Sequence, residues 1–212
     1  DMDPLTLRLR NYAERDANED APFTSKELRA CYQVGAERFG WSRRKSVPGS
    51  LREGRERIGL GMATGVWDAQ MVTTSARAVL DAEGRLEVAT ATADIGTGTY
   101  TILTQIAADA LGLELEEVTA KLADTTLPKA PVEGGSWTAA SAGAAVQAAC
   151  RALGKRLLSQ AGSVPGKPLA GLSIDDVRFI RGRIESREDP SKSVALKEIM
   201  AAAELDRLEA VE

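Results

Sequence analysis

The chain of 212 residues contains no histidine and only two cysteines. Without imidazole, a histidine-activated serine or cysteine nucleophile is excluded, and so is a histidine-ligated metal centre. Cys31 and Cys150 lie far apart and each falls within a helical pattern, which argues against a disulfide framework or a zinc site. Both cysteines are therefore predicted to be small core residues, and we assign no catalytic or metal-ligating residue from the sequence.

Aromatic residues are also few, at 4%, and no apolar run reaches the length of a membrane span. The formal net charge is -4 and no long basic run interrupts the chain, so neither nucleic acid nor a membrane is expected as a partner. The first residues, Asp1 to Pro4, resemble neither a signal peptide nor an ordinary translation start. We therefore expect the chain to be an internal piece of a longer protein.

Small and apolar residues are plentiful. Hydrophobic residues make up 43% of the chain, which is enough to bury a core at this length. Alanine and glycine are abundant, which favours helices packed closely on a sheet. The predicted fold class is α+β, with a helical leader, a central domain and a final hairpin and helix.

In the leader, Pro4 fits a first helical turn, and Thr24 to Glu27 have the spacing of a capping box for a helix that Gly40 ends. The apolar positions of that helix, Cys31 and Phe39 among them, are expected to face inward. Residues 46–57, with proline and glycine among charges, are predicted to form an exposed loop.

The central domain is predicted to be an antiparallel β-meander with packed helices, in the order β-β-α-β-α. The meander comprises residues 58–72, 75–80 and 86–92, followed by a helix at 102–111, a buried strand at 118–122 and a long helix at 138–159. After a linker at 163–168, we predict a hairpin of 177–180 and 183–186 and a terminal helix at 193–205. The predicted domains are residues 1–55, 56–162 and 163–212, the last being either an appendage or part of the central domain.

Two short stretches, residues 94–99 and 134–141, are rich in glycine and hydroxyl residues and each leads into an apolar-faced helix. Such loops are expected to present free backbone N–H groups and the positive end of a helix dipole to an anion. About one helix and one strand separate the two. This spacing favours a single extended, phosphate-bearing ligand held at both ends.

Plainer interpretations of these loops also stand. Gly96 and Gly98 fit a tight turn with Thr99 as N-cap, and the second glycine pair fits simple flexibility. Asp94 and Asp124 are the acidic residues nearest the loops, and each is either a base or, more commonly, a brace for its turn. Trp137 is expected to pack, with stacking on a ligand as the second reading.

Residues 93–101, 105–112 and 134–141 resemble the molybdenum-cofactor-binding large subunit of the xanthine dehydrogenase and aldehyde oxidase family. Residues 3–12 and 38–41 resemble the segment that links the two cofactor domains in those enzymes. The resemblance covers residues 1 to about 159 well and the remainder loosely.

The resemblance implies a subunit that hydroxylates aldehydes or nitrogen heterocycles with oxygen from water. Such a subunit uses molybdenum held by the dithiolene of molybdopterin, often in the cytosine dinucleotide form, and passes electrons to iron–sulfur and FAD subunits. The implied partners are the remainder of the large subunit, these two subunits and the substrate. Carried over residue by residue, the implied contacts are Gly96, Thr97, Gly98 and Thr99 with the pterin and dithiolene, and Ser136, Thr138, Ala139, Ala140 and Ser141 with the phosphate or dinucleotide.

The sequence departs from the family pattern in two respects. Many members carry a glutamine where this chain has Thr97, so a hydroxyl replaces one side-chain amide. The family's catalytic glutamate, in a motif far downstream, and another glycine-rich loop upstream are both absent from this sequence. The piece alone is therefore expected to be inactive.

Two other functions compete with this interpretation. The same loops fit a noncatalytic nucleotide- or phosphate-binding module, or a scaffold whose hydroxyl-rich turns are only helix caps. The expected compartment is the cytoplasm, because cysteine is scarce, with the periplasm as the alternative if a partner subunit supplies the signal.

Overall fold

The computed structural model describes residues 2–23, 25–67 and 70–212. The chain forms two compact units, Asp1–Val66 and Trp67–Glu212. Among the described helices, none combines the length and the apolar character that crossing a bilayer requires.

The first unit consists of short elements. Its first helix starts as predicted, because Asp3 Oδ1 accepts hydrogen bonds from the N–H groups of Leu5 at 3.0 Å and Thr6 at 3.1 Å. The unit contains α1 (Pro4–Arg10), β1 (Arg15–Asp16), β2 (Ala21–Pro22), α2 (Leu28–Phe39), the 3-10 turn η1 (Trp41–Arg43), β3 (Arg52–Glu53) and β4 (Glu56–Arg57).

Helix α2 ends where the sequence predicts, at Gly40 with φ +75°, but its apolar positions are not buried. Cys31 is exposed and Phe39 is 52% exposed, so the prediction that they face inward is wrong. The reason is that no described residue of this unit is buried, since its helices and two-residue strands supply no second apolar layer. The predicted cap, Thr24, lies outside the described residues, and Glu27 at the N-cap makes no side-chain hydrogen bond.

The second unit is built on a four-stranded sheet with the strand order β11-β5-β6-β7. The strands β5 (Arg77–Asp81), β6 (Leu86–Ala89) and β11 (Arg207–Val211) pair antiparallel, whereas β7 (Val118–Lys121) runs parallel to β6. The sheet is therefore mixed rather than the predicted antiparallel meander. Its parallel pair arises because α3 (Thr99–Leu111) crosses from β6 to β7.

The predicted first strand of the meander, residues 58–72, is wrong: among 58–67 and 70–72 no strand forms. The edge of β5 that this segment was expected to pair with is occupied by β11, with Glu209 opposite Val79. Strand β11 was not predicted. Its five residues close the sheet from the C-terminal end of the chain.

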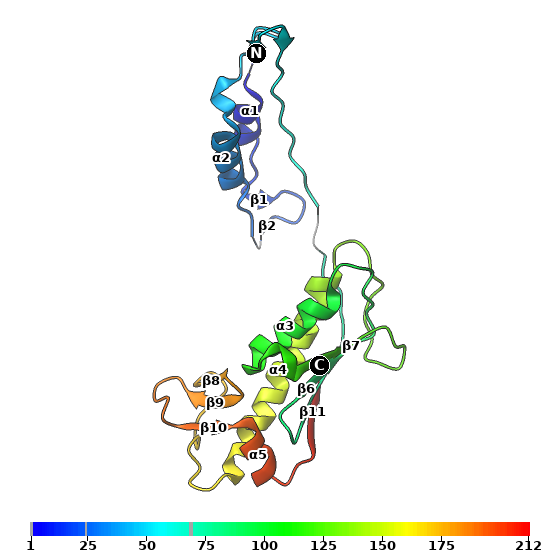
Figure 1. Ribbon diagram of the computed structural model, residues 1–212, viewed down its shortest axis with the longest axis vertical. Coiled ribbons are helices and arrows are strands. Elements are labelled where there is room, and N and C mark those ends of the chain that lie inside the picture. The colour runs from blue at the N-terminus through cyan, green and yellow to red at the C-terminus, as the bar shows by residue number, and fades with distance from the viewer. Residues whose placement is uncertain (1, 24, 68–69) are drawn as a thin grey trace. The chain divides into compact units, whose positions relative to one another are not determined.

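One face of the sheet is covered by α3 and α4 (Thr138–Gln160), which lie side by side (Figure 1). Alternate residues of β5 and β6, such as Leu80 and Val88, meet the apolar faces of both helices. The core is made largely of small and aliphatic side chains, as composition predicts. Its fully buried members include Ala78, Leu86, Leu103, Ala107, Leu111, Val146, Ala149, Cys150, Leu153 and Leu157.

The end of the chain packs into the same unit. The predicted hairpin is present as β8 (Val177–Ile180) and β9 (Arg183–Ser186), and β10 (Ser193–Ala195) adds to it. The predicted helix at 193–205 is shorter, because α5 spans Leu196–Ala202 and its expected first turn is β10. The predicted linker at 163–168 is anchored rather than free, since Val164 is buried. Two 3-10 turns, η2 (Leu115–Glu117) and η3 (Ala161–Ser163), complete the unit.

Gly112 brings the end of α3 into contact with the β8–β9 hairpin. It ends α3 as predicted, with φ +60°, and a Cβ built on it would lie 2.3 Å from the backbone N of Ile180. Its carbonyl also accepts the N–H of Gly182 at 2.8 Å. Only glycine allows the end of α3 to contact β8 this closely.

Candidate functional site

The first predicted loop connects β6 to α3 and is organised around Asp94. Its Oδ1 accepts the N–H groups of Gly96 at 2.8 Å and Gly98 at 3.2 Å, and its Oδ2 accepts that of Tyr100 at 3.3 Å. These bonds, the one from Gly96 first, lower the pKa of Asp94. Asp94 is therefore an ionised brace for the turn, which confirms the bracing interpretation. A proton acceptor tuned toward neutral pH would need the opposite shift.

This arrangement corrects one expectation. Three N–H groups of the first loop are not free for a ligand, because Asp94 already accepts their hydrogen bonds. Gly98 rather than Thr99 occupies the N-cap position of α3. What the loop offers a ligand is instead the exposed hydroxyl of Thr97, whose oxygen lies 3.3 Å from that of Thr99, a buried residue at the inner side of the loop.

The glycines of this loop leave their backbone open. Gly96 has φ +100° and Gly98 φ +82°, and a Cβ built on either would meet no atom within 4 Å. The left-handed backbone favours glycine here, and the open space lets a ligand approach the main chain. The loop thus fits a flat or bulky group laid against it.

The second loop precedes α4 and presents its N-terminus without a capping side chain. Gly135 and Ser136 have φ of +55° and +59°, and Trp137 at the N-cap makes no side-chain cap. The N–H of Ser141 donates to the Trp137 carbonyl at 2.8 Å, so the N–H groups of the three preceding residues come before the first helical bond. The expected uncapped helix N-terminus is therefore present, and binding of an anion there stays a prediction.

Trp137 braces this loop with its ring edge. Its indole Nε1–H donates to the carbonyl of Val132 at 2.5 Å, and the side chain is half-buried. In this structure the indole therefore holds its own loop through this hydrogen bond, and the packing and stacking roles both stay predictions. Asp124 likewise braces its own turn, because its Oδ1 accepts the N–H and hydroxyl of Thr126 at 2.8 and 2.7 Å, which lowers the pKa of Asp124.

The two loops face one cleft of about 370 Å³. Loops separated by nearly forty residues are brought together because α3 and α4 lie side by side with their N-termini at the same end (Figure 1). Most residues that line the cleft carry a hydroxyl or a methyl group. The lining residues are Ile95, Thr97, Thr99, Ile102, Glu133, Gly134, Ser136, Thr138 and Ala139.

Five of the nine predicted site residues line this cleft and four do not. The five are Thr97, Thr99, Ser136, Thr138 and Ala139, and the four are Gly96, Gly98, Ala140 and Ser141. Ser141 is 2% exposed, and its Oγ accepts the N–H of Val72 at 3.0 Å. Its hydroxyl therefore holds the segment before β5 against α4.

Sequence reasoning missed Glu133, which also lines the cleft. Its Oε1 accepts the hydroxyl of Thr92 at 2.9 Å and the N–H of Ala93. These bonds, that from Ala93 first, lower the pKa of Glu133. The only signal in the sequence is an acidic residue directly before a glycine pair. Its partners lie 40 and 41 residues away, which no local pattern reveals.

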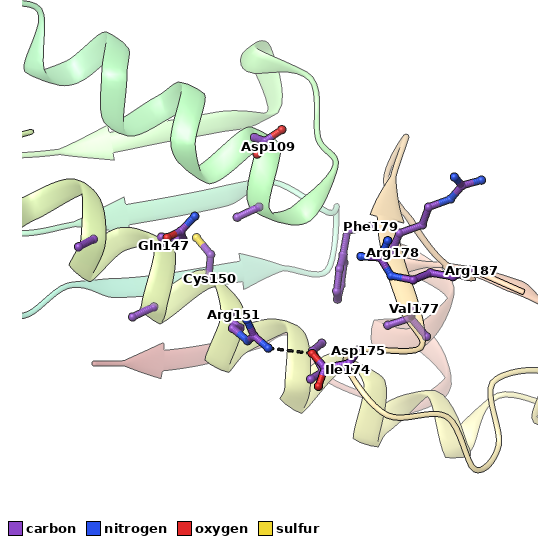
Figure 2. A pocket seen from close by; sticks show the side chains of 13 residues that line it. Asp109, Gln147, Cys150, Arg151, Ile174, Asp175, Val177, Arg178, Phe179 and Arg187 are labelled. Carbon is purple, nitrogen blue, oxygen red and sulfur yellow. Dashed lines mark hydrogen bonds and ion pairs between the residues drawn. The ribbon is translucent and has the colours of Figure 1, made fainter. Parts of the chain in front are cut away.

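A larger cavity lies elsewhere, between α3, α4 and β8, and has a volume of about 630 Å³ (Figure 2). It contains an ion pair of Arg151 and Asp175 at 2.9 Å, and Cys150 on its α4 side. Burial raises the pKa of the Cys150 thiol to about 12, so this group is an unreactive core residue as predicted. No residue of either loop lines this cavity. We therefore assign the site to the smaller cleft, where hydroxyls and an uncapped helix end converge.

Comparison with known proteins gives this arrangement a context. Residues 34–212 match the family described as Molybdopterin cofactor-binding domain, and this range contains both loops. The chain belongs to this family.

Two relatives of the chain are molybdenum-binding subunits, in agreement with this family. The chain is 34% identical over all 212 residues to the aldehyde oxidoreductase molybdenum-binding subunit PaoC of Escherichia coli (strain K12). It is 29% identical over 128 residues, or 55% of the chain, to the putative xanthine dehydrogenase molybdenum-binding subunit XdhA of the same strain. The chain spans only 27% of the length of PaoC and 16% of that of XdhA.

Solved structures support the mixed α/β fold of this molybdopterin cofactor-binding domain. CO dehydrogenase from Oligotropha carboxidovorans matches the whole chain with a TM-score of 0.71 at 19% identity, over 30% of its own length. Quinoline 2-oxidoreductase from Pseudomonas putida 86 matches 66% of the chain with a TM-score of 0.53 at 25% identity, over 18% of its own length. The family is thus established from sequence, and the structural likeness supports the fold.

The cleft fits the phosphate-bearing pterin for which the family is named. The hydroxyls of its lining and the N–H groups at the start of α4 suit a phosphate, and the open faces of Gly96 and Gly98, which flank the lining residue Thr97 in sequence, suit a flat ring. Among the described residues, no group of three or more acidic or cysteine side chains is placed to hold a metal ion.

Proposed function

We propose that this chain supplies two of the loops that hold molybdopterin in a molybdenum hydroxylase. The observation that carries the proposal is the single cleft onto which Thr97 and Thr99 of one loop and Ser136 and Thr138 of the other converge. When bound, the cofactor supplies a metal centre for two-electron oxidation of a substrate with oxygen taken from water.

The two loops have different chemistry, and we propose that they bind different parts of the ligand. The hydroxyls of Ser136 and Thr138 and the N–H groups of the first turn of α4 would donate to the phosphate. The first loop has fewer free donors for a phosphate, because the N–H groups of Gly96, Gly98 and Tyr100 already donate to Asp94. Its glycine faces and threonine hydroxyls would therefore lie against the pterin and the dithiolene. The cytosine dinucleotide form, which would extend along α4 past Ala139 and Ala140, is part of the proposal.

We propose that the catalytic base and the substrate pocket lie in the part of the protein beyond this chain. Glu133, which lines the cleft, and Asp94, in the first loop, both have lowered pKa values and accept hydrogen bonds from the backbone, so neither is poised to take a proton near neutral pH. An aldehyde or nitrogen heterocycle as substrate, and iron–sulfur and FAD subunits as partners, are proposals for the whole protein. The name of PaoC, an aldehyde oxidoreductase, supports the first of these.

A noncatalytic phosphate-binding module is the second candidate function. The uncapped N-terminus of α4 favours it, because this end would bind a simple phosphate without any pterin. The two candidates predict different ligands in the purified protein, namely molybdenum with a pterin in the first and a metal-free phosphate compound in the second.

The test is to purify the protein that carries this chain from a host that makes the cofactor, and to measure molybdenum and released pterin per chain. Acid release of CMP would identify the dinucleotide form. The double variant Ser136→Ala and Thr138→Val is expected to retain ~10-fold less cofactor, because two donors to the phosphate are lost at about 0.5–1.5 kcal/mol each. Thr119→Val, on an exposed strand position, is the matched control and is expected to load fully. Wild-type protein without molybdenum and pterin would contradict the proposal.

A further inference from the structure

We infer that Glu133 is a positioning residue that fixes the second loop against the first and so sets the width of the cleft between them. The inference rests on the proposed function for the ligand that the cleft receives. Glu133 itself lines the cleft beside Gly134, at the point where the second loop begins.

The first side of this contact is rigid. Thr92 is fully buried, and its carbonyl accepts the N–H of Ala123 at 2.8 Å. The preceding residue is held as well, because the N–H of Ala91 donates to the carbonyl of Pro128 at 2.7 Å. Thr92 and Ala93, in the segment that follows β6, therefore form a fixed platform directly before the Asp94 turn.

The second side is attached to that platform through Glu133. Among the described residues after Lys129, two hydrogen bonds join the second loop to this platform. Glu133 Oε1 is the acceptor of both. Gly134 and Gly135 follow, and the next long-range hydrogen bond is that from Val72 to Ser141, already inside α4. The bonds of Trp137 to Val132 and Gly134 are local to the loop. Without Glu133, the glycine pair would let the loop move from the platform.

The charge of Glu133 matters for this role. One carboxylate oxygen accepts from two donors, a hydroxyl and a backbone N–H, and such charge-assisted bonds are about twice as strong as neutral ones. A glutamine at this position keeps an acceptor oxygen without the charge, and an alanine keeps neither. Cofactor retention is therefore expected to fall in the order Glu, Gln, Ala.

The experiment compares Glu133→Gln and Glu133→Ala with the control Glu116→Gln, an exposed glutamate of η2, in the whole protein that carries this chain. Two quantities are measured. The first is amide exchange in protein purified from a host that cannot make the cofactor. The second is molybdenum and pterin retained by protein from a host that makes it.

In the cofactor-free protein, Glu133→Ala is expected to accelerate amide exchange by ~10-fold or more at Ala93, whose N–H loses its acceptor, and at Trp137, whose N–H donates to Gly134 within the second loop, with Glu133→Gln between it and wild type. Exchange in the core strand β5 and the melting temperature are expected to stay unchanged, which a general loss of stability would not allow. The same variants are expected to lose cofactor in the same order, whereas the control matches wild type in both measurements.

Unchanged exchange at Ala93 and Trp137 in Glu133→Ala would overturn the inference, whatever the cofactor content. Faster exchange with full cofactor retention would also overturn it, because the loop would then be released without consequence for binding. If wild-type protein holds no cofactor but the exchange pattern appears, the proposed function fails and the link between the loops stands.

Discussion

At the scale of single residues, the cleft depends on acidic side chains that bind backbone rather than ligand. Asp94 holds the first loop through three N–H groups, and Glu133 links the second loop to Thr92 and Ala93. The sequence predicted bracing as one role for Asp94, because Asx turns are local. It could not predict Glu133, because that contact depends on how β6 and the second loop meet in space.

Asp94 and Glu133 determine how the stability of the loops changes at acidic pH. Both have pKa values in the folded protein that lie below the ordinary values of about 3.9 for Asp and 4.3 for Glu. Their contribution to stability is therefore complete above pH ~4.5 and is lost as the pH falls through the lowered values. In a variant with Trp41→Phe and Trp67→Phe, the fluorescence of Trp137 should be constant from pH 7 to about 5 and change below ~4. A transition centred above pH 5 would contradict this account.

The contact of Gly112 with β8 gives a second prediction. Gly112→Ala places a methyl group against the backbone of Ile180 and is expected to destabilise the protein by about 3 kcal/mol or more. Gly171→Ala is the matched control, because Gly171 has φ +79° but open space around a Cβ. It should cost only the left-handed backbone penalty of about 1 kcal/mol. If urea unfolding gave equal losses of unfolding free energy for Gly112→Ala and Gly171→Ala, α3 would not contact β8 as described.

At the scale of elements, the sequence predicted those helices and strands of the second unit whose apolar residues recur with a clear period. The helices α3 and α4, strand β7 and the β8–β9 hairpin were all anticipated, since each has a regular apolar stripe or a glycine turn. The partner of β5 was assigned wrongly. Residues 58–72 alternate enough to be read as a strand, whereas the actual partner, β11, is five residues at the far end of the chain. Strand pairing over that distance is a property of the tertiary fold.

Helix α4 is the element on which the core depends most. Leu153 is fully buried on its inner face, so Leu153→Ala is expected to cost about 2–5 kcal/mol of unfolding free energy. Lys155, two residues on and exposed, is the control, and Lys155→Ala should change stability by less than about 0.5 kcal/mol. Similar losses for both variants in urea unfolding would mean that α4 does not bury this face.

At the scale of the whole molecule, the two units differ in how they are stabilised. All the buried residues among those described belong to the second unit, whereas the first has none. Composition and length predicted a sizeable core but not that it would be confined to residues after Trp67. The prediction of Cys31 as a core residue failed for this reason, and that of Cys150 is confirmed.

This difference predicts how the chain responds to shortening. Residues 67–212 alone should fold and unfold within about 1 kcal/mol of the same unit in the full chain, because their core is complete. Residues 1–66 alone should show little cooperative structure by circular dichroism and NMR, since no buried apolar layer offsets the conformational entropy of folding. A cooperative thermal transition in residues 1–66 would contradict this view.

The most direct test of the central claim is amide exchange of the protein that carries this chain, compared between cofactor-loaded and cofactor-free forms. The account predicts that protection gained on loading is concentrated in residues 95–99 and 136–140, the two sides of the cleft. Protection at residues 174–187 around the larger cavity instead, or no protection in this chain at all, would contradict it.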